Sequence, residues 1–339
     1  MKYIGLDVSK KFSYVTVMDE KGVVEMHGKV DNREEALVAC LGKVEGDCSL
    51  VMEATRNWYY LYETLEGRVK EIHLAHPLKV RAIAEARIKT DKIDSKILAD
   101  LLRVSMLPES YIPPQDVRDQ REQLRYRASL VSLQTQVKNK VHALLDKNGR
   151  HCPYSDLFGG RGMDWLLGQG LREVYAEELT GYLEVLEALK EQITAVGKNI
   201  LANSQQSPEA RLIQTMPGVG YYLSMLITYE IGDINRFPDQ HKLSSFAGLV
   251  PSTYASGNVV RHGRITKQGS KWLRWALIEA AQKAPVNSPK LKAFFERIAR
   301  RQGRKTARVA LARHMLKIIY HMLKEKQPFA EDSKRSAIA

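Results

Sequence analysis

Residues 3–8 read Tyr3-Ile4-Gly5-Leu6-Asp7-Val8, an apolar run that carries one acidic residue near its end. A second apolar run covers residues 14–18, and a third begins after the turn residues 19–22. Short apolar runs separated by turn residues predict a strand followed by a hairpin. Further along, the patterns predict a helix over 31–41, a strand over 49–53, a helix over 58–65, a strand over 69–74 and a helix that begins at Pro77. This alternation predicts an α/β domain over residues 1–107.

Two long helices are predicted after the prolines at positions 108, 113 and 114. They cover residues 116–147 and 172–203, and a loop with Pro153 and Gly159-Gly160 separates them. Apolar residues recur every seven positions in both, at Leu130, Val137, Leu144, Leu179, Leu186, Ile193 and Ile200. This heptad spacing predicts a linker and a long antiparallel coiled-coil hairpin over residues 108–207. The hairpin could serve as an oligomerisation arm or as an internal spacer.

The last part of the chain is predicted to be a mainly α-helical C-terminal domain over residues 208–328. Helical patterns cover residues 219–231, 270–284, 289–301 and 304–325. A stretch rich in glycine and serine, residues 252–269, separates the first two and is expected to be a loop. Residues 329–339, which follow Pro328, are expected to form a disordered tail.

Positive charge is concentrated in this C-terminal part. The 339 residues contain 52 Lys and Arg against 39 Asp and Glu, a net charge of +13. Residues 256–326 alone hold 18 basic and 3 acidic residues, so the rest of the chain is close to neutral. Such a basic region predicts a polyanionic partner, and it suits DNA and RNA equally well. The alternative is a basic surface that serves solubility only.

The cysteines and the absence of long apolar runs indicate in which cellular compartment the protein is expected. The chain has three cysteines, Cys40, Cys48 and Cys152, without the CxxC spacing of a zinc site and in an odd number for a disulfide framework. The N-terminus leads directly into a strand pattern rather than a signal peptide. No apolar run reaches the roughly 18 residues of a membrane span. We therefore expect a cytoplasmic protein with no membrane partner.

Four acidic residues are candidate metal ligands. Asp7 lies in the first strand pattern, where an ionised carboxylate is costly to bury without a partner or a metal ion. Glu53 ends the short strand pattern 49–53. Asp91 and Asp94 follow Thr90, which can cap a helix, and their i, i+3 spacing places both carboxylates on one side of that helix. These are the positions at which an RNase H-like fold carries its metal ligands.

Magnesium is the ion that such a group would hold. Mg²⁺ prefers carboxylate oxygens, water and substrate phosphate. Two such ions about 4 Å apart can stabilise the attacking and leaving oxygens of a phosphodiester. The alternative is that Asp91 and Asp94 cap a solvated helix and that Asp7 is a residue of the strand-end turn.

A second motif predicts contact with a nucleic-acid backbone. Residues 216–220 read Met216-Pro217-Gly218-Val219-Gly220 and precede an apolar helical pattern. Glycines at a helix N-terminus let backbone N–H groups point at a phosphate. The stretch therefore predicts a helix-hairpin-helix that holds DNA through Gly218 and Gly220, or else an ordinary corner between two helices.

A third motif surrounds Ser256, whose neighbour Gly257 would let the backbone approach a substrate closely. Arg261, Arg264 and Lys267 can hold phosphate oxygens and stabilise charge that develops at phosphorus. A serine needs activation to act as a nucleophile, so spacing alone leaves that role open. A basic helical surface follows, with Lys271, Arg274, Arg297, Arg300, Arg301, Arg304, Lys305 and Arg308.

Together these motifs resemble the DEDD family of insertion-sequence transposases over about residues 2–328. The matching segments are GLDVSKK with Asp7, MEAT with Glu53, TDKID with Asp91 and Asp94, PGVG, FAGLVPSTYASG with Ser256, and GRITKQGSKWLRWAL. They occur in the family's order.

The resemblance implies a transposase or recombinase that cleaves and exchanges DNA strands. It implies a RuvC-like N-terminal domain that binds Mg²⁺ through Asp7, Glu53, Asp91 and Asp94, with two ions per site and Mn²⁺ as a substitute. It implies that Ser256 attacks a scissile phosphate and forms a covalent phosphoserine–DNA link. The implied partners are donor and target double-stranded DNA, a bridge RNA, and further copies of the chain, with dimers that assemble to tetramers. The implied location is the bacterial or archaeal nucleoid.

Three other functions fit parts of the sequence. A junction-resolving nuclease of RNase H-like fold would hydrolyse DNA with water and would not use Ser256. A non-catalytic scaffold would bind nucleic acid without cleaving it. An actin-like sugar kinase suits GLDVS, but the basic C-terminal part and the lack of a later glycine-rich phosphate loop argue against it.

Overall fold

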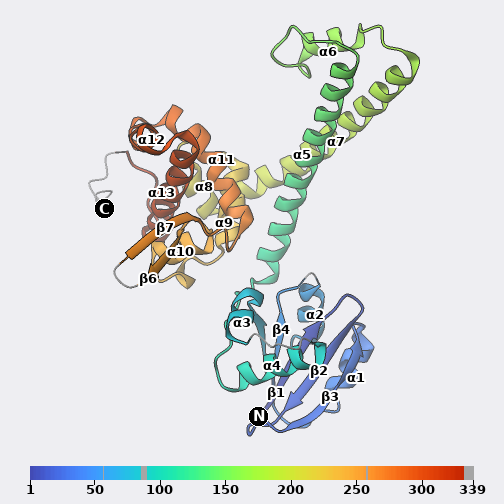
Figure 1. Ribbon diagram of the computed structural model, residues 1–339, viewed down its shortest axis with the longest axis vertical. Helices are drawn as coiled ribbons and strands as arrows, with labels where there is room; N and C mark the ends of the chain where they lie inside the picture. The colour runs from blue at the N-terminus through green and yellow to red at the C-terminus, as the bar shows by residue number, and fades with distance from the viewer. Residues whose placement is uncertain (56, 85–89, 257–258, 332–339) are drawn as a thin grey trace. The chain divides into compact units, whose positions relative to one another are not determined.

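The computed structural model describes residues 1–55, 57–84, 90–256 and 259–331 (Figure 1). The chain divides into two compact units, Met1–Pro113 and Pro114–Ala339. The first unit is a mixed α/β structure, and the second is mainly helical. This confirms the predicted change from an α/β sheet to a helical remainder. Among the described residues, no helix is long and apolar enough to cross a membrane.

Unit 1 is built on one five-stranded sheet with the order β3-β2-β1-β4-β5. Its strands are β1 (Lys2–Val8), β2 (Phe12–Met18), β3 (Val24–Asp31), β4 (Cys48–Glu53) and β5 (Glu71–Ala75). Strands β1, β2 and β3 pair antiparallel, while β4 runs parallel to β1 and β5 parallel to β4. The antiparallel pairs are joined by short turns, and the parallel pairs need helical connections, as the alternating pattern predicted.

Helices cover both faces of this sheet. They are α1 (Glu34–Leu41), α2 (Trp58–Leu65), α3 (Pro77–Ile83) and α4 (Asp91–Arg103). Leu37 of α1 and Leu61 of α2 pack against Leu6 and Met52 on one face. On the other face, Leu98 and its neighbours in α4 pack against Val51. Because side chains alternate between the faces of a strand, each strand contributes to both cores.

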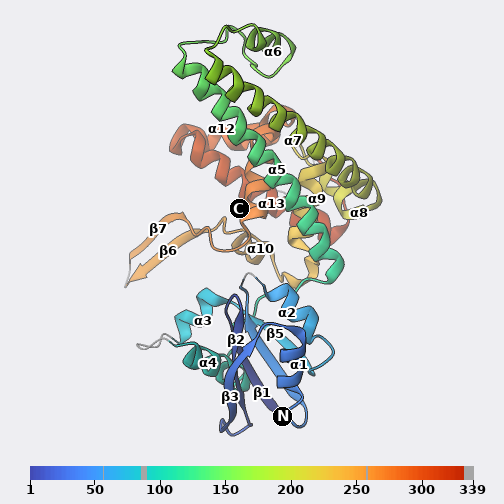
Figure 2. The same ribbon diagram turned by 90° about the vertical axis from the view of Figure 1, so that its right-hand side faces the viewer.

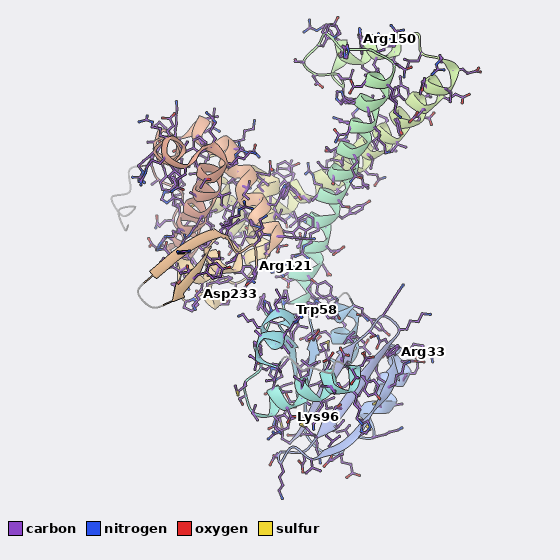
Figure 3. All side chains as sticks on the ribbon, in the orientation of Figure 1. Arg33, Trp58, Lys96, Arg121, Arg150 and Asp233 are labelled. Carbon is purple, nitrogen blue, oxygen red and sulfur yellow. The ribbon has the colours of Figure 1, made fainter. Side chains whose placement is uncertain are left out.

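Unit 2 begins with two long antiparallel helices, α5 (Gln115–Lys147) and α7 (Glu173–Gln206) (Figure 2). Leu144, near the end of α5, packs with Leu179, near the start of α7. Most of the predicted heptad positions are buried, and Val137 and Ile193 are half-buried. A short helix, α6 (Gly160–Leu167), lies at the far end of the pair, where Figure 3 labels Arg150.

The other end of the helix pair packs into a helical core. This core contains α8 (Pro208–Gln214), α9 (Tyr221–Ile231), the 3-10 helix η1 (Ile234–Arg236), α10 (Gln240–Phe246), α11 (Lys271–Asn287), α12 (Pro289–Gln302) and α13 (Arg304–Glu325). Leu124 of α5 and Ile200 of α7 are completely buried in it. The hairpin and the C-terminal helices therefore form one continuous unit.

A buried ionic network joins α5, α9 and α11. The side chain of Glu230 on α9 is only 2% exposed. Arg125 donates to Glu230 Oε1 from Nη2 at 2.6 Å and from Nε at 3.0 Å, and Ser270 Oγ donates to Oε2 at 2.8 Å. Ser270 also caps α11, since its hydroxyl accepts from Leu273 N. The network therefore fixes the start of α11 against the base of the helix pair.

We expect Arg125→Met to destabilise unit 2 by about 3 kcal/mol, because it leaves the Glu230 carboxylate buried without its cation. The measurement is hydrogen exchange of the α9 and α11 amides in the full chain. The double variant R125M/E230Q should recover part of the loss, since it removes the stranded charge as well. Unchanged exchange in Arg125→Met would show that the pair contributes nothing to stability.

One prediction for the C-terminal part was wrong. The stretch 252–269, expected as a loop, contains a hairpin of β6 (Pro251–Ser256) and β7 (Val259–Ile265). Of the predicted disordered tail over residues 329–339, the structure describes residues 329–331, and residues 332–339 lie outside the described residues. Phe329 N donates to Thr215 Oγ1 at 2.8 Å, and its ring packs against the core. Ser288 Oγ donates to Glu331 Oε1 at 2.6 Å.

Candidate functional site

Asp7 and Glu53 lie side by side at one edge of the sheet. Strands β1 and β4 run parallel and pair in register up to Leu6 and Met52. The next residue of each strand is Asp7 and Glu53, at the carboxyl ends of the two strands. Both residues are partly buried. Strand pairing thus brings together two acids that are 46 positions apart in the sequence.

Both acids belong to the face of the sheet that α4 covers. Tyr3 and Val51 pack with the α4 cluster, whereas Leu6 and Met52 belong to the core on the opposite face. Side chains two positions apart on a strand share a face. Asp7 therefore shares the face of Tyr3, and Glu53 shares the face of Val51.

Helix α4 lies very close to β1 at Gly5. A Cβ atom at Gly5 would stand 1.9 Å from Ser95 O and 2.7 Å from Ala99 N, so only glycine fits. The hydroxyls of Ser95 and Thr16, on the neighbouring strand, share a hydrogen bond of 2.7 Å. The absence of a side chain on β1 is what allows the helix backbone to pack onto the strand.

The direction of α4 follows from its other end. Arg103, its last residue, lies beside Gly22 in the turn that follows β2, and this turn is at the starting end of β1. The first turn of α4 is therefore directed toward the carboxyl end of β1. Asp91 and Asp94 lie in that turn, and Thr90 caps it by accepting from Ile93 N.

The four predicted metal ligands thus share one face and one edge of unit 1. Asp91 is exposed, and Asp94 is partly buried like Asp7 and Glu53. Within the described parts of the chain, no three His, Cys, Asp or Glu side chains are placed as one ligand group for a metal ion. The backbone arrangement and the carboxylate chemistry fit Mg²⁺, although the side chains do not converge on one point.

The PGVG segment forms the turn between α8 and α9. Gly218 has a φ of +83°, and a Cβ there would stand 2.5 Å from Ala280 O of α11. This glycine is therefore required by packing against α11 as well as by the turn. Gly220 is different: it is the N-cap of α9, it is exposed, and a Cβ there would meet no atom within 4 Å. Of the two glycines, Gly220 is the one that leaves its backbone open to a ligand.

Ser256 is the last residue of β6, and it pairs with Val259, the first residue of β7. The next residue, Gly257, which was predicted to let the backbone approach a substrate, lies outside the described residues. Arg261 on β7 pairs with Tyr254 on β6, and both are exposed, with Tyr254 71% accessible. The backbone of the hairpin thus carries Ser256 two residues after the exposed ring of Tyr254.

The predicted basic residues divide by environment. Arg264, Lys267 and Lys305 line a cavity of about 1500 Å³, which we call the cationic groove. Arg274 instead donates from Nη1 to Ala247 O at 3.0 Å, and burial lowers the pKa of its guanidinium. Its guanidinium therefore supports the backbone before β6. Of the other predicted cations, Arg297 also lines the cationic groove and Arg308 is half-buried. The rest are exposed, namely Arg261, Lys271, Arg300, Arg301 and Arg304.

The sequence did not predict the groove itself. Lys290 and Arg297 of α12 and Arg313 and Lys317 of α13 complete its lining of cations. The spacing of four between Arg313 and Lys317 places them on one face of α13, which was the available signal. Their convergence with α12 depends on how the two helices pack.

Two family models match this chain. The transposase model of the DEDD type associated with IS110 matches residues 4–148, which include Asp7, Glu53, Asp91 and Asp94. The chain belongs to the DEDD family of insertion-sequence transposases. The second model, the transposase IS116/IS110/IS902 family, matches residues 210–296 of this transposase, which include the PGVG turn and Ser256.

Bacterial relatives of this transposase extend over most of its length. The transposase for insertion sequence element IS1111A of Coxiella burnetii is 28% identical, with 97% of this chain and 91% of the relative covered. The transposase for insertion sequence element IS1328 of Yersinia enterocolitica is 23% identical, with 82% of each chain covered. The pilin gene-inverting protein of Moraxella bovis is 24% identical, with 83% and 81% covered. This transposase is therefore an enzyme that acts on DNA, of a family with a general dependence on divalent metal ions.

Proposed function

We propose that this transposase cleaves and exchanges DNA strands through a covalent phosphoserine intermediate, with Ser256 as the nucleophile. The observation that carries the proposal is the close packing of α4 against β1 at Gly5. This packing directs Asp91 and Asp94 toward the edge of the sheet that holds Asp7 and Glu53. The hairpin of β6 and β7 carries Ser256 at the end of β6 and the exposed Arg261 on β7, which supports the serine half of the proposal.

The acidic edge supports an RNase H-like fold for unit 1. The sheet has the order β3-β2-β1-β4-β5 with only β2 antiparallel to its neighbours, and acids end β1 and β4. The short helices around PGVG support a helix-hairpin-helix, and the buried heptad positions of α5 and α7 support a coiled coil.

Asp7, Glu53, Asp91 and Asp94 are the residues that would hold Mg²⁺. Their carboxylate oxygens are the ligands that this ion prefers, and the first turn of α4 lies toward the sheet edge that holds Asp7 and Glu53. Bound there, Mg²⁺ would stabilise negative charge on the attacking and leaving oxygens of the phosphodiester.

The proposed step at Ser256 is a transesterification. Ser256 Oγ forms a bond to the scissile phosphorus as the bond from phosphorus to the leaving deoxyribose oxygen breaks. The serine loses its proton to a base, and the leaving oxygen gains one and becomes a free hydroxyl. Exposed cations such as Arg261 and Arg264 would balance the extra charge on the phosphoryl oxygens during this exchange. Because one phosphoester replaces another, the reverse step can join a different strand.

A bridge RNA and an assembly of several copies complete the proposal. The excess of basic residues in 256–326 suits an RNA as well as donor and target DNA. The long helix pair offers an arm through which dimers could form and associate into tetramers. In such an assembly, the acids of one copy could act on the strand held by the serine of another.

The test is a strand-cleavage and strand-joining assay with the full chain, its RNA and both DNA partners. We expect Asp7→Asn to lower the rate at least about a hundredfold, because loss of one ligand weakens the metal site. Excess Mg²⁺ or Mn²⁺ should recover part of the rate, and DNA affinity should remain. Asn preserves the shape of the side chain, and hydrogen exchange of β1 serves as the folding control.

The same assay separates the alternatives. A water-using nuclease would leave free 5′-phosphate and 3′-hydroxyl ends without a protein adduct. A scaffold would bind DNA and show no cleavage in the wild type. Full activity of Asp7→Asn at low Mg²⁺ would show that the Asp7 carboxylate is not a metal ligand.

A further inference from the structure

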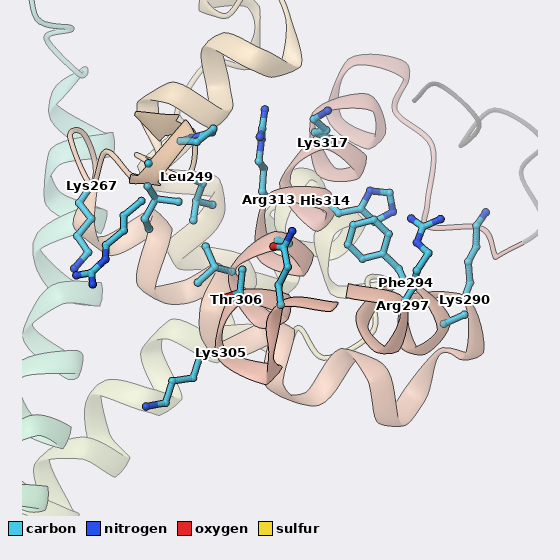
Figure 4. Close-up of a pocket in the computed structure, with 18 residues that line it drawn as sticks. Leu249, Lys267, Lys290, Phe294, Arg297, Lys305, Thr306, Arg313, His314 and Lys317 are labelled. Atoms are coloured by element: carbon cyan, nitrogen blue, oxygen red, sulfur yellow. The ribbon is translucent and has the colours of Figure 1, made fainter. Parts of the chain in front are cut away.

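We propose that the cationic groove binds an unpaired nucleic-acid strand, with its bases on an apolar floor and its phosphates along the rim. This inference deepens the proposed function and rests on it only for the source of the strand, since strand exchange exposes unpaired nucleotides. The groove belongs to unit 2 and lies among β7, α12 and α13 (Figure 4).

The charges on the groove select a polyanion. Two cations come from the end of β7 and the residues after it, Arg264 and Lys267. Two come from α12, Lys290 and Arg297, and three from α13, Lys305, Arg313 and Lys317. No Asp or Glu belongs to the lining as the described residues form it. A groove with cations along its walls attracts a phosphodiester backbone.

The floor of the groove distinguishes an unpaired strand from a duplex. Phe294 and His314 stack face to face, with ring centroids 4.3 Å apart and 9° between the planes. Figure 4 shows the two rings against each other, with Arg297 and Lys290 beside them. Leu249 and Val309 add apolar lining. A duplex hides the faces of its bases, whereas an unpaired strand can place them on aromatic and apolar groups.

The imidazole of His314 is suited to a stacking surface. Burial lowers its pKa, and the nearby cations Lys317, Lys290 and Arg297 lower it further. The ring is therefore uncharged at neutral pH and stacks as a flat aromatic group. The guanidinium of Arg297 lies 5.4 Å from the centroid of the Phe294 ring, so a cation stands beside the ring pair.

The size and the donors of the groove suit an extended ligand. Its volume of about 1500 Å³ exceeds the roughly 300–1000 Å³ of a small-molecule site. Within the described structure, the buried Nε of Arg313 has no hydrogen-bond partner. Lys290 is engaged, because its Nζ donates to Glu331 O at 3.2 Å. Arg297 and Lys317 lie near the ring pair of Phe294 and His314, so they are placed to hold phosphates beside stacked bases.

The experiment measures the affinity of the full chain for fluorescent oligothymidine, oligouridine and a duplex of equal length, across a salt series. The test variant is R297Q/K317Q. The matched control is K283Q/K292Q, which removes the same charge from exposed positions on α11 and α12 that do not line the groove. We expect R297Q/K317Q to bind the unpaired strands at least about tenfold more weakly, with the slope of log affinity against log salt reduced by about 1.4. Duplex affinity should change no more than in the control.

A second variant tests the stacking floor. Phe294→Leu keeps an apolar side chain but removes the ring, so affinity for the unpaired strand should fall roughly fivefold or more. The quenching of a 2-aminopurine base in the strand should fall with it. Hydrogen exchange of α12 and α13 would identify a folding defect.

The outcomes are distinct from those of the strand-exchange assay. A loss confined to oligouridine would support the groove with RNA as its ligand, and a loss confined to oligothymidine would support it with DNA. The proposal would be overturned if R297Q/K317Q lost affinity equally for duplex and unpaired strands. It would also be overturned if R297Q/K317Q and K283Q/K292Q lost equal affinity for the unpaired strands. Binding needs no cleavage, so Asp7→Asn should bind the unpaired strand like the wild type even where it fails in strand exchange.

Discussion

Replacing Ser256 with alanine is expected to reduce covalent attachment of DNA to background while DNA binding persists. The hydroxyl oxygen is the atom that would form the bond to phosphorus, and alanine offers no substitute for it. The exposed cations of the hairpin and the later helices remain, so the electrostatic part of the affinity should be unchanged. The difference in covalent DNA attachment between the wild type and Ser256→Ala would therefore identify the nucleophile.

The measurement is capture of the tagged chain under denaturing conditions, followed by sequencing of the attached DNA and mass spectrometry of the modified residue. Ser252→Ala is the matched control. Ser252 lies on the same strand, and its hydroxyl donates to Arg264 O at 3.1 Å. It should keep the adduct. An equal adduct yield from Ser256→Ala, or a phosphoryl group mapped to another residue, would contradict the assignment.

Gly5→Ala is expected to detach α4 from the sheet and to cost unit 1 about 3 kcal/mol or more. The added Cβ would meet the backbone atoms Ser95 O and Ala99 N, and a helix backbone cannot yield as a flexible side chain can. The hydrogen bond between Ser95 and Thr16 would be lost with the displacement. Because α4 carries two of the four acids, strand cleavage should fall to background as well.

Gly28→Ala is the matched control for this prediction. Gly28 is also a strand glycine of the same sheet, but a Cβ there would meet no atom within 4 Å. Alanine at this position should be neutral or stabilising by roughly 0.5 kcal/mol. Hydrogen exchange of the α4 and β1 amides in the full chain measures both variants. Equal protection in the two variants would show that the close contact at Gly5 is not required.

Local sequence patterns predicted much of the secondary structure. The strands of unit 1, the cap at Thr90 and the long helices α5 and α7 follow from apolar periodicity and capping residues, which act over a few positions. The hairpin of β6 and β7 was missed although its sequence held a signal. Gly257-Asn258 between two runs of β-branched and aromatic residues is a typical turn dipeptide, and the surrounding serines and glycines obscured it.

Local sequence patterns could not predict how the residues of the candidate site come together. Asp91 and Asp94 could be placed on one side of a helix, and Asp7 and Glu53 at the ends of strands. Their common edge depends on the parallel pairing of β1 with β4 and on the direction of α4. The same holds for Glu230, whose partner Arg125 lies 105 positions earlier in the chain.

The sequence alone established the order of strands and helices in unit 1, the basic C-terminal part and the residues that could perform phosphodiester chemistry, because each depends on composition or short spacing. Tertiary structure alone distinguished Gly5 from Gly28, assigned Gly218 to packing against α11, and brought cations of α12 and α13 around the ring pair of Phe294 and His314. The physical reason is that backbone approach and the convergence of side chains are set by which elements pack together. That packing depends on contacts between residues far apart in the sequence.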